Sequence, residues 1–181
     1  MASKIDKLTT LHRKLGRRYD RMQELLDRED DSLFRQAPSV SNWSVANQLH
    51  HVATATWLML VGVDRISKQL SPAAAEGSIN TIGRALLLSG RFPRGKAQAP
   101  ARSQPPDNVT RGDIKKALDR SRDLYERTPD IFQAASASSW RAKHPYFGML
   151  DACQWMKLAV IHADHHFLIV DDIDARAGQS S

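Results

Sequence analysis

Five of the seven histidines occur in two short segments whose spacing is typical of a metal site. His162 and His166 are four residues apart, so on a helix their imidazoles project from one face, one turn apart, and can reach the same ion. A catalytic zinc ion typically takes three protein ligands and leaves one position for water or substrate. The third ligand would come from His50 or His51. Helical phase does not decide between these neighbours, which lie about 100° apart around a helix.

Helical periodicity dominates the elements that must position these side chains. Apolar residues recur at spacings of three, four and seven over residues 3–28, which predicts an amphipathic first helix. A second helix is predicted over residues 44–69. Its first residue is a serine, a good N-cap, and Pro72 follows shortly after its end. Residues 79–88 are predicted to form a short helix.

The second half of the chain contains the start signals of two more long helices. Thr110 and Asp113 fit a capping box that opens the third helix, which Pro129 should kink or restart. Asp151 and Gln154 form a second capping box, and the last helix then continues to about residue 175. The last helix is therefore predicted to carry the His-x-x-x-His pair.

Together these elements predict an all-α protein, a four-helix bundle with one long crossover connection. The crossover is the stretch 91–112, which is rich in proline and arginine. No strand alternation of convincing length occurs. We expect residues 1–181 to form a single domain, with residues 176–181 as a flexible tail. In such bundles, metal sites are built from inward-pointing side chains on facing helices.

Composition limits the classes of function. Apolar residues make up 41% of the chain and charged residues 25%, as in a soluble folded protein. The charged N-terminal segment and the lack of a long apolar segment predict a cytoplasmic protein with no membrane partner. The formal charge of +6 is dispersed and not interleaved with aromatic residues, which argues against nucleic acid as a partner. The single cysteine, Cys153, excludes an internal disulfide and a multi-cysteine zinc site.

Three motifs, in this order, resemble those of the DinB/YfiT-like superfamily. Residues 43–51 resemble its second-helix motif W-S-x(4)-L-x-H, which implies that His51, rather than His50, is the ligand. Residues 144–150, H-P-Y-F-G-M-L, resemble an H-P-F-F-G-x-L signature of one uncharacterised branch. Residues 162–166, H-A-D-H-H, resemble the ligand pair of the last helix and the H-x-D-H-H string of the same branch.

The resemblance implies a four-helix bundle that binds Zn²⁺, Ni²⁺, Fe²⁺ or a similar ion through His51, His162 and His166. Characterised members include thiol-dependent transferases and isomerases. We therefore expect a divalent-metal-dependent enzyme that transfers a low-molecular-weight thiol cosubstrate to a small-molecule electrophile. The alternatives are a metal-dependent hydrolase and a non-catalytic stress or binding module that the metal stabilises. Bundles of this family often dimerise, so a homodimer is one arrangement open to the chain.

Residues near the three histidines carry further expectations. His144 either packs in a rigid entry loop or lines the pocket mouth as an acid, a base or a fourth donor. No catalytic residue is otherwise identifiable. Asp164 is a candidate to orient a ligand or a neighbouring basic group, although its helical phase points partly away from the ligand face. Ile169 stands where related last helices often place a glutamine or histidine, so a polar contact to metal or substrate is absent there.

Overall fold

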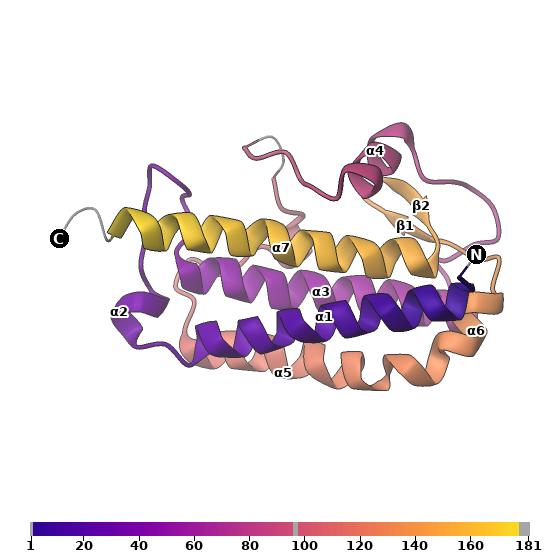
Figure 1. The fold of residues 1–181 in the computed structure, drawn as a ribbon, viewed down its shortest axis with the longest axis horizontal. Helices are drawn as coiled ribbons and strands as arrows, with labels where there is room; N and C mark the ends of the chain where they lie inside the picture. The colour runs from indigo at the N-terminus through magenta and orange to yellow at the C-terminus, as the bar shows by residue number, and fades with distance from the viewer. Residues whose placement is uncertain (1, 96–97, 178–181) are drawn as a thin grey trace.

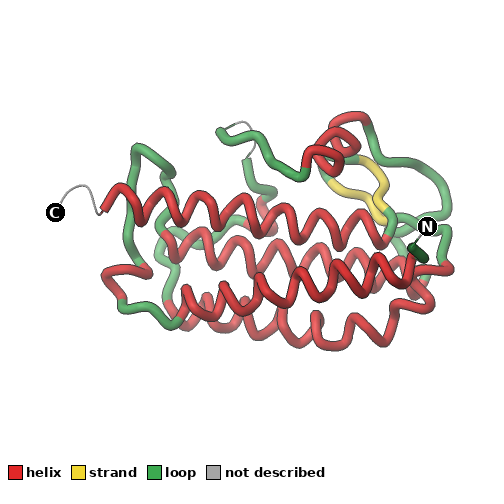
Figure 2. The backbone as a smooth tube through the Cα atoms, in the orientation of Figure 1, coloured by secondary structure: helices red, strands yellow, loops and turns green. Residues whose placement is uncertain are grey.

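Four long helices lie side by side in the computed structural model, which describes residues 2–95 and 98–177 (Figures 1 and 2). They are α1 (Lys4–Leu26), α3 (Val45–Lys68), α5 (Arg111–Arg127) and α7 (Ala152–Ala177). Helices α1 and α7 run in one direction, and α3 and α5 run in the other (Figure 1). The parallel pair α3 and α5 therefore needs a long crossover. The predicted four-helix bundle with one crossover is confirmed.

Side-chain caps fix where the long helices begin. In α3, the Ser44 hydroxyl accepts the N–H of Asn47, and the Asn47 side chain accepts the N–H of Ser44. Thr110 and Asp113 form the same reciprocal pair at the start of α5, as predicted. At α7, the corresponding pair is Asp151 with Gln154. Each capping box satisfies two backbone donors that the first turn of a helix leaves free.

Helix α3 lies in the middle of the bundle, where it packs against both α5 and α7 (Figure 1). Its residues are accordingly buried on most of its faces, whereas α1 is buried along one stripe that includes Leu8, Leu15 and Tyr19. Because α3 is central and α7 packs against it, side chains on the facing surfaces of these two helices are withdrawn from solvent. The predicted site residues lie on this pair.

Shorter elements complete the chain. They are α2 (Asp30–Leu33), α4 (Thr81–Ser89), the 3-10 turns η1 (Ala101–Ser103) and η2 (Thr128–Ile131), and α6 (Phe132–Ala137). Pro129 lies in η2 and interrupts the third helix, as predicted. Residues 176 and 177 of the predicted tail belong to α7, and residues 178–181 lie outside the described residues. Within the described part of the chain, no helix is long and apolar enough to cross a membrane.

A small β-hairpin, which the sequence did not indicate, precedes α7. Strand β1 (Ala142–His144) pairs antiparallel with β2 (Gly148–Leu150). Strands of three residues are too short for apolar and polar positions to alternate visibly, so this hairpin carries no periodic signal. The hairpin places His144 at the end of the bundle where α7 begins (Figure 1).

Candidate metal centre

The structure brings His51 of α3 together with His162 and His166 of α7. One ring nitrogen from each lies within 4.8 Å of the others, and all three residues are buried. The neighbouring His50 is only half-buried and does not belong to this cluster. His162 and His166 lie one turn apart on α7, and His51 faces them from α3, as expected for ligands on facing helices.

Two carbonyl oxygens orient two of these rings. The Nδ1–H of His51 donates to the backbone carbonyl of Ser103, at 2.7 Å, and the Nδ1–H of His166 donates to the Gln48 side-chain carbonyl, at 2.6 Å. A carbonyl oxygen can only accept, so in the neutral ring the proton must sit on Nδ1. The Nε2 atom of each ring therefore presents a lone pair to the centre of the cluster, the arrangement found in metal-ligating histidines.

The donor set fits a divalent cation. Nε2 of His51 lies 3.1 Å from Nε2 of His162. The Nδ1 atom of His162 is buried without a hydrogen-bond partner among the described residues. Converging nitrogen lone pairs in a buried space are poorly satisfied by one another, whereas a shared cation would satisfy them together. Imidazole donors suit zinc, nickel and iron, so the ligand types do not select one of these metals.

Burial keeps the three histidines in the form that binds metal. Desolvation, with a smaller contribution from the neighbouring His50 and His165, outweighs the opposing effect of the hydrogen bond to Ser103 and lowers the pKa of His51 to about 4. It also lowers the pKa values of His162 and His166 well below their ordinary value, again helped by the surrounding imidazoles. At neutral pH the three rings are therefore uncharged, and no proton has to be displaced before their Nε2 atoms coordinate an ion.

Aromatic rings cover the cluster. Trp43, just before α3, lies with its ring centroid 5.0 Å from that of His51 and 6.4 Å from that of His166. Phe92, in the crossover, meets the edge of His162 at 5.7 Å between centroids. These rings exclude water from the imidazoles, and this exclusion strengthens electrostatic interactions at the centre.

His144 is connected to the cluster through two phenylalanine rings. It stacks on Phe147 at 4.4 Å, Phe147 lies 6.1 Å from Phe92, and Phe92 contacts His162. Nδ1 of His144 accepts the backbone N–H of Tyr146, so the proton of the neutral ring is on Nε2. With its Nδ1 occupied, a neutral His144 can donate a hydrogen bond but has no free lone pair for a proton.

The sequence also raised expectations for two other residues of α7, Asp164 and Ile169. Asp164 does not orient a ligand histidine; its carboxylate pairs instead with a basic group, Arg18 of α1, through contacts of 2.9 and 2.7 Å. This ion pair links α7 to α1. Ile169 is partly buried and packs against the apolar core. The two carbonyl groups that orient His51 and His166 belong instead to the Ser103 backbone and the Gln48 side chain.

Sequence reasoning missed the two groups that orient the rings. Gln48 lies three residues before His51, so the two side chains project from one face of α3, and this spacing was the signal available in the sequence. Ser103 contributes its backbone carbonyl from the crossover, and a backbone group leaves no trace in residue type. The crossover thus contributes to the candidate metal centre as well as connecting two helices.

Replacing Gln48 by leucine is expected to weaken metal binding by about 10–100-fold, because the Nδ1–H of His166 loses its acceptor. Competition with a chromophoric chelator measures the affinity. Gln48→Glu retains an acceptor oxygen and should bind metal at least as tightly as the wild type. Wild-type affinity in Gln48→Leu would show that this hydrogen bond does not orient His166.

The metal-free protein is expected to lose stability as the pH falls from about 6.5 to about 4. Burial lowers the pKa of His144 from 6.5 to about 4, so in this window the unfolded chain takes up a proton that the folded protein does not. The contribution of a neutral buried histidine to the free energy of unfolding is complete above about pH 6.5 and is lost as the pH falls to about 4. The loss is up to ~1.4 kcal/mol per pH unit for each such histidine. Urea unfolding at a series of pH values should show a shallower decline for His144→Gln. An unchanged slope would contradict the burial of a neutral His144.

Comparison with known families agrees with this geometry. A family model described as the DinB superfamily matches residues 14–170, a span that includes all three clustered histidines and His144. No curated protein and no solved structure matches the chain. The assignment of the chain therefore rests on this family match together with the histidine cluster.

Proposed function

The chain belongs to the DinB superfamily, and on that premise we propose that it is a divalent-metal-dependent enzyme that transfers a small thiol to an electrophile. The observation that carries the proposal is the buried cluster of His51, His162 and His166. A divalent ion held there would act as a Lewis acid and lower the pKa of a thiol or water beside it.

The surroundings of the cluster favour a thiol over water as the nucleophile. The three clustered residues are all neutral imidazoles, with no carboxylate among them. Asp164, the acid within the same motif, is engaged by Arg18. Hydrolysis normally uses a general base, often a carboxylate, to take a proton from water, and no carboxylate belongs to the cluster among the described residues. A thiol, whose ordinary pKa is already near 8.5, needs less help to lose its proton.

The chain's own residues would then bind and orient the reactants. The Ser103 carbonyl and the Gln48 amide hold two of the rings. Trp43 and Phe92 keep water from the nucleophile. In this proposal His144, whose neutral ring carries its proton on Nε2, donates a hydrogen bond to the electrophile or its leaving group. The sulfur would form a bond to an electrophilic carbon as the leaving group departs with its electron pair, and the thiol proton passes to solvent.

Thiol consumption tests the proposal. Purified protein is stripped with a chelator, reloaded with Zn²⁺, Ni²⁺ or Fe²⁺, and mixed with glutathione or cysteine and a chloronitrobenzene electrophile. The expected result is thioether formation that depends on the metal and is lost in His162→Ala. Nitrophenyl acetate without thiol provides the hydrolase comparison.

The outcomes separate the alternatives. Equal thiol consumption with and without metal would contradict the proposal. Ester hydrolysis that depends on the metal, without thioether formation, would replace it with the hydrolase. Metal binding that raises the melting temperature but supports neither reaction would favour the non-catalytic module.

A further inference from the structure

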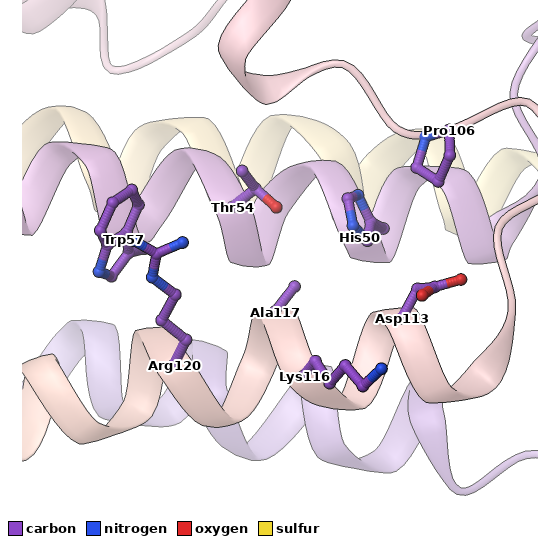
Figure 3. A pocket seen from close by; sticks show the side chains of 8 residues that line it. All are labelled: His50, Thr54, Trp57, Pro106, Asp113, Lys116, Ala117 and Arg120. Carbon is purple, nitrogen blue, oxygen red and sulfur yellow. The ribbon is translucent and has the colours of Figure 1, made fainter.

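A groove outside the metal centre lies between α3 and α5. Its volume is about 360 Å³, within the range of small-molecule sites. Residues of α3 form one wall, residues of α5 form the other, and Pro106 of the crossover closes one end (Figure 3). None of the clustered histidines lines it. His50, which does not belong to the histidine cluster, lines the groove.

Two cations on α5 face this groove. Lys116 and Arg120 are four residues apart, so they lie on the same side of the helix, where two like charges repel. Neither forms an ion pair in the part of the chain that the structure describes, whereas the adjacent Lys115 pairs with Asp119 at 2.7 Å. The groove therefore carries two cations and one acid, Asp113, whose charge interacts with that of Lys116, so one positive charge remains in excess.

The guanidinium of Arg120 is held in place. It reaches across the groove and lies 3.4 Å from the centre of the Trp57 ring (Figure 3). A guanidinium stacked on an indole face keeps its N–H groups free at the edge, where they can donate to a carboxylate or phosphate. An ordinary exposed arginine would have to be ordered by its ligand, whereas Arg120 is already ordered.

The opposite wall and the far end of the groove set further limits on a ligand. Thr54 offers a hydroxyl from α3, and His50 has a buried Nδ1 with no partner among the described residues, an uncommon state for a polar atom. Asp113 lies at the end beside Pro106, and its carboxylate accepts hydrogen bonds from Thr110. This acid would repel a second negative group, so the groove fits a ligand that is anionic at one end.

We propose that this groove binds a small organic anion, with its carboxylate or phosphate held by Lys116 and Arg120 and its uncharged part against Trp57. The site is independent of the proposed thiol chemistry, since it shares no residue with the histidine cluster.

Titrations of the metal-loaded protein test the proposal. The probes are benzoate and phenyl phosphate, with benzamide as an uncharged analogue, and the readout is the indole N–H resonance of Trp57. Either anion should shift this resonance in a saturable way, and benzamide should not. Lys116→Gln and Arg120→Gln should each weaken binding about tenfold, the cost of one charge-assisted hydrogen bond. Lys116→Gln leaves the stack on Trp57 in place, which keeps the readout intact.

Lys115→Gln is the matched control, because it removes the same charge from the adjacent position, which points away to Asp119. It should leave binding unchanged. Binding of one anion but not the other would identify the preferred group. Three results would overturn the proposal: no response to either anion, an equal response to benzamide, or the same weakening in Lys115→Gln as in Lys116→Gln. Metal content, measured in each variant, should not change.

Discussion

Replacement of His162 by alanine is expected to abolish tight metal binding. His162 supplies one of only three nitrogens that converge within 4.8 Å among the described residues, so its removal leaves two protein ligands for the ion. The loss in affinity should exceed the roughly 10–100-fold that follows from changes to orienting residues. Isothermal titration of chelator-stripped protein with Zn²⁺ or Ni²⁺ measures it.

The same substitution should remove the stabilisation that the metal provides. A ligand present at about a thousand times its Kd stabilises the folded state by ~4 kcal/mol, which is roughly 10 °C in melting temperature for a chain of this size. A chelator should therefore lower the melting temperature of the wild type but not that of His162→Ala.

Adjacent histidines provide matched controls for both measurements. His165→Ala changes a half-buried ring on the same turn of α7, and His50→Ala changes the neighbour of His51 on α3. Neither residue belongs to the cluster, so both variants should bind one ion with nearly wild-type affinity. Loss of the ion in His50→Ala but not in His51→Ala would reverse the assignment of the third ligand.

Replacement of Gly148 by alanine is expected to destabilise the hairpin that carries His144. Gly148 has a φ of +82°, and a Cβ atom there would lie 2.6 Å from the backbone carbonyl oxygen of Ser78. The clash is with backbone, which cannot rotate away as a side chain can. Strain of this kind costs about 1–3 kcal/mol, and the steric overlap adds to it. Chemical denaturation of the metal-loaded protein measures the loss.

Gly90 is a control that separates the cost of backbone strain from the cost of steric overlap. Its φ of +66° is also positive, but a Cβ atom added there would meet no other atom within 4 Å, so Gly90→Ala should cost only the conformational part, about 1 kcal/mol. Gly148→Ala should be clearly more destabilising and should also reduce thiol-transfer activity through the displacement of His144. Equal effects of the two substitutions would mean that the hairpin does not pack against residues 78–80.

The bundle could be predicted from sequence because its signals are local. Capping residues such as Ser44, Thr110 and Asp151 act on backbone donors within the next three residues, and apolar stripes repeat within one helix. Spacing likewise showed that His162 and His166 share a face. None of these inferences required knowledge of which helix packs against which.

The rest of the site depends on contacts between distant segments. Both His50 and His51 suited the phase of a helix buried on most faces, so periodicity did not distinguish them. The motif resemblance implied His51, and the physical reason is the placement of α7 against α3. The carbonyl of Ser103 meets His51 across more than fifty residues of chain, and its role belongs to the backbone. Asp164 has the right chemistry to orient a ligand, but α1 places Arg18 beside it.

X-ray absorption spectroscopy of the purified protein, with metal content measured on the same sample, tests the central claim most directly. We expect one divalent ion per chain, coordinated by three imidazole nitrogens and by one or two further ligand atoms that the protein does not supply. The His51→Ala/His162→Ala/His166→Ala variant should contain no stoichiometric metal. A wild-type protein that takes up no ion after reloading, or an ion with fewer than three imidazole ligands, would contradict a three-histidine metal centre.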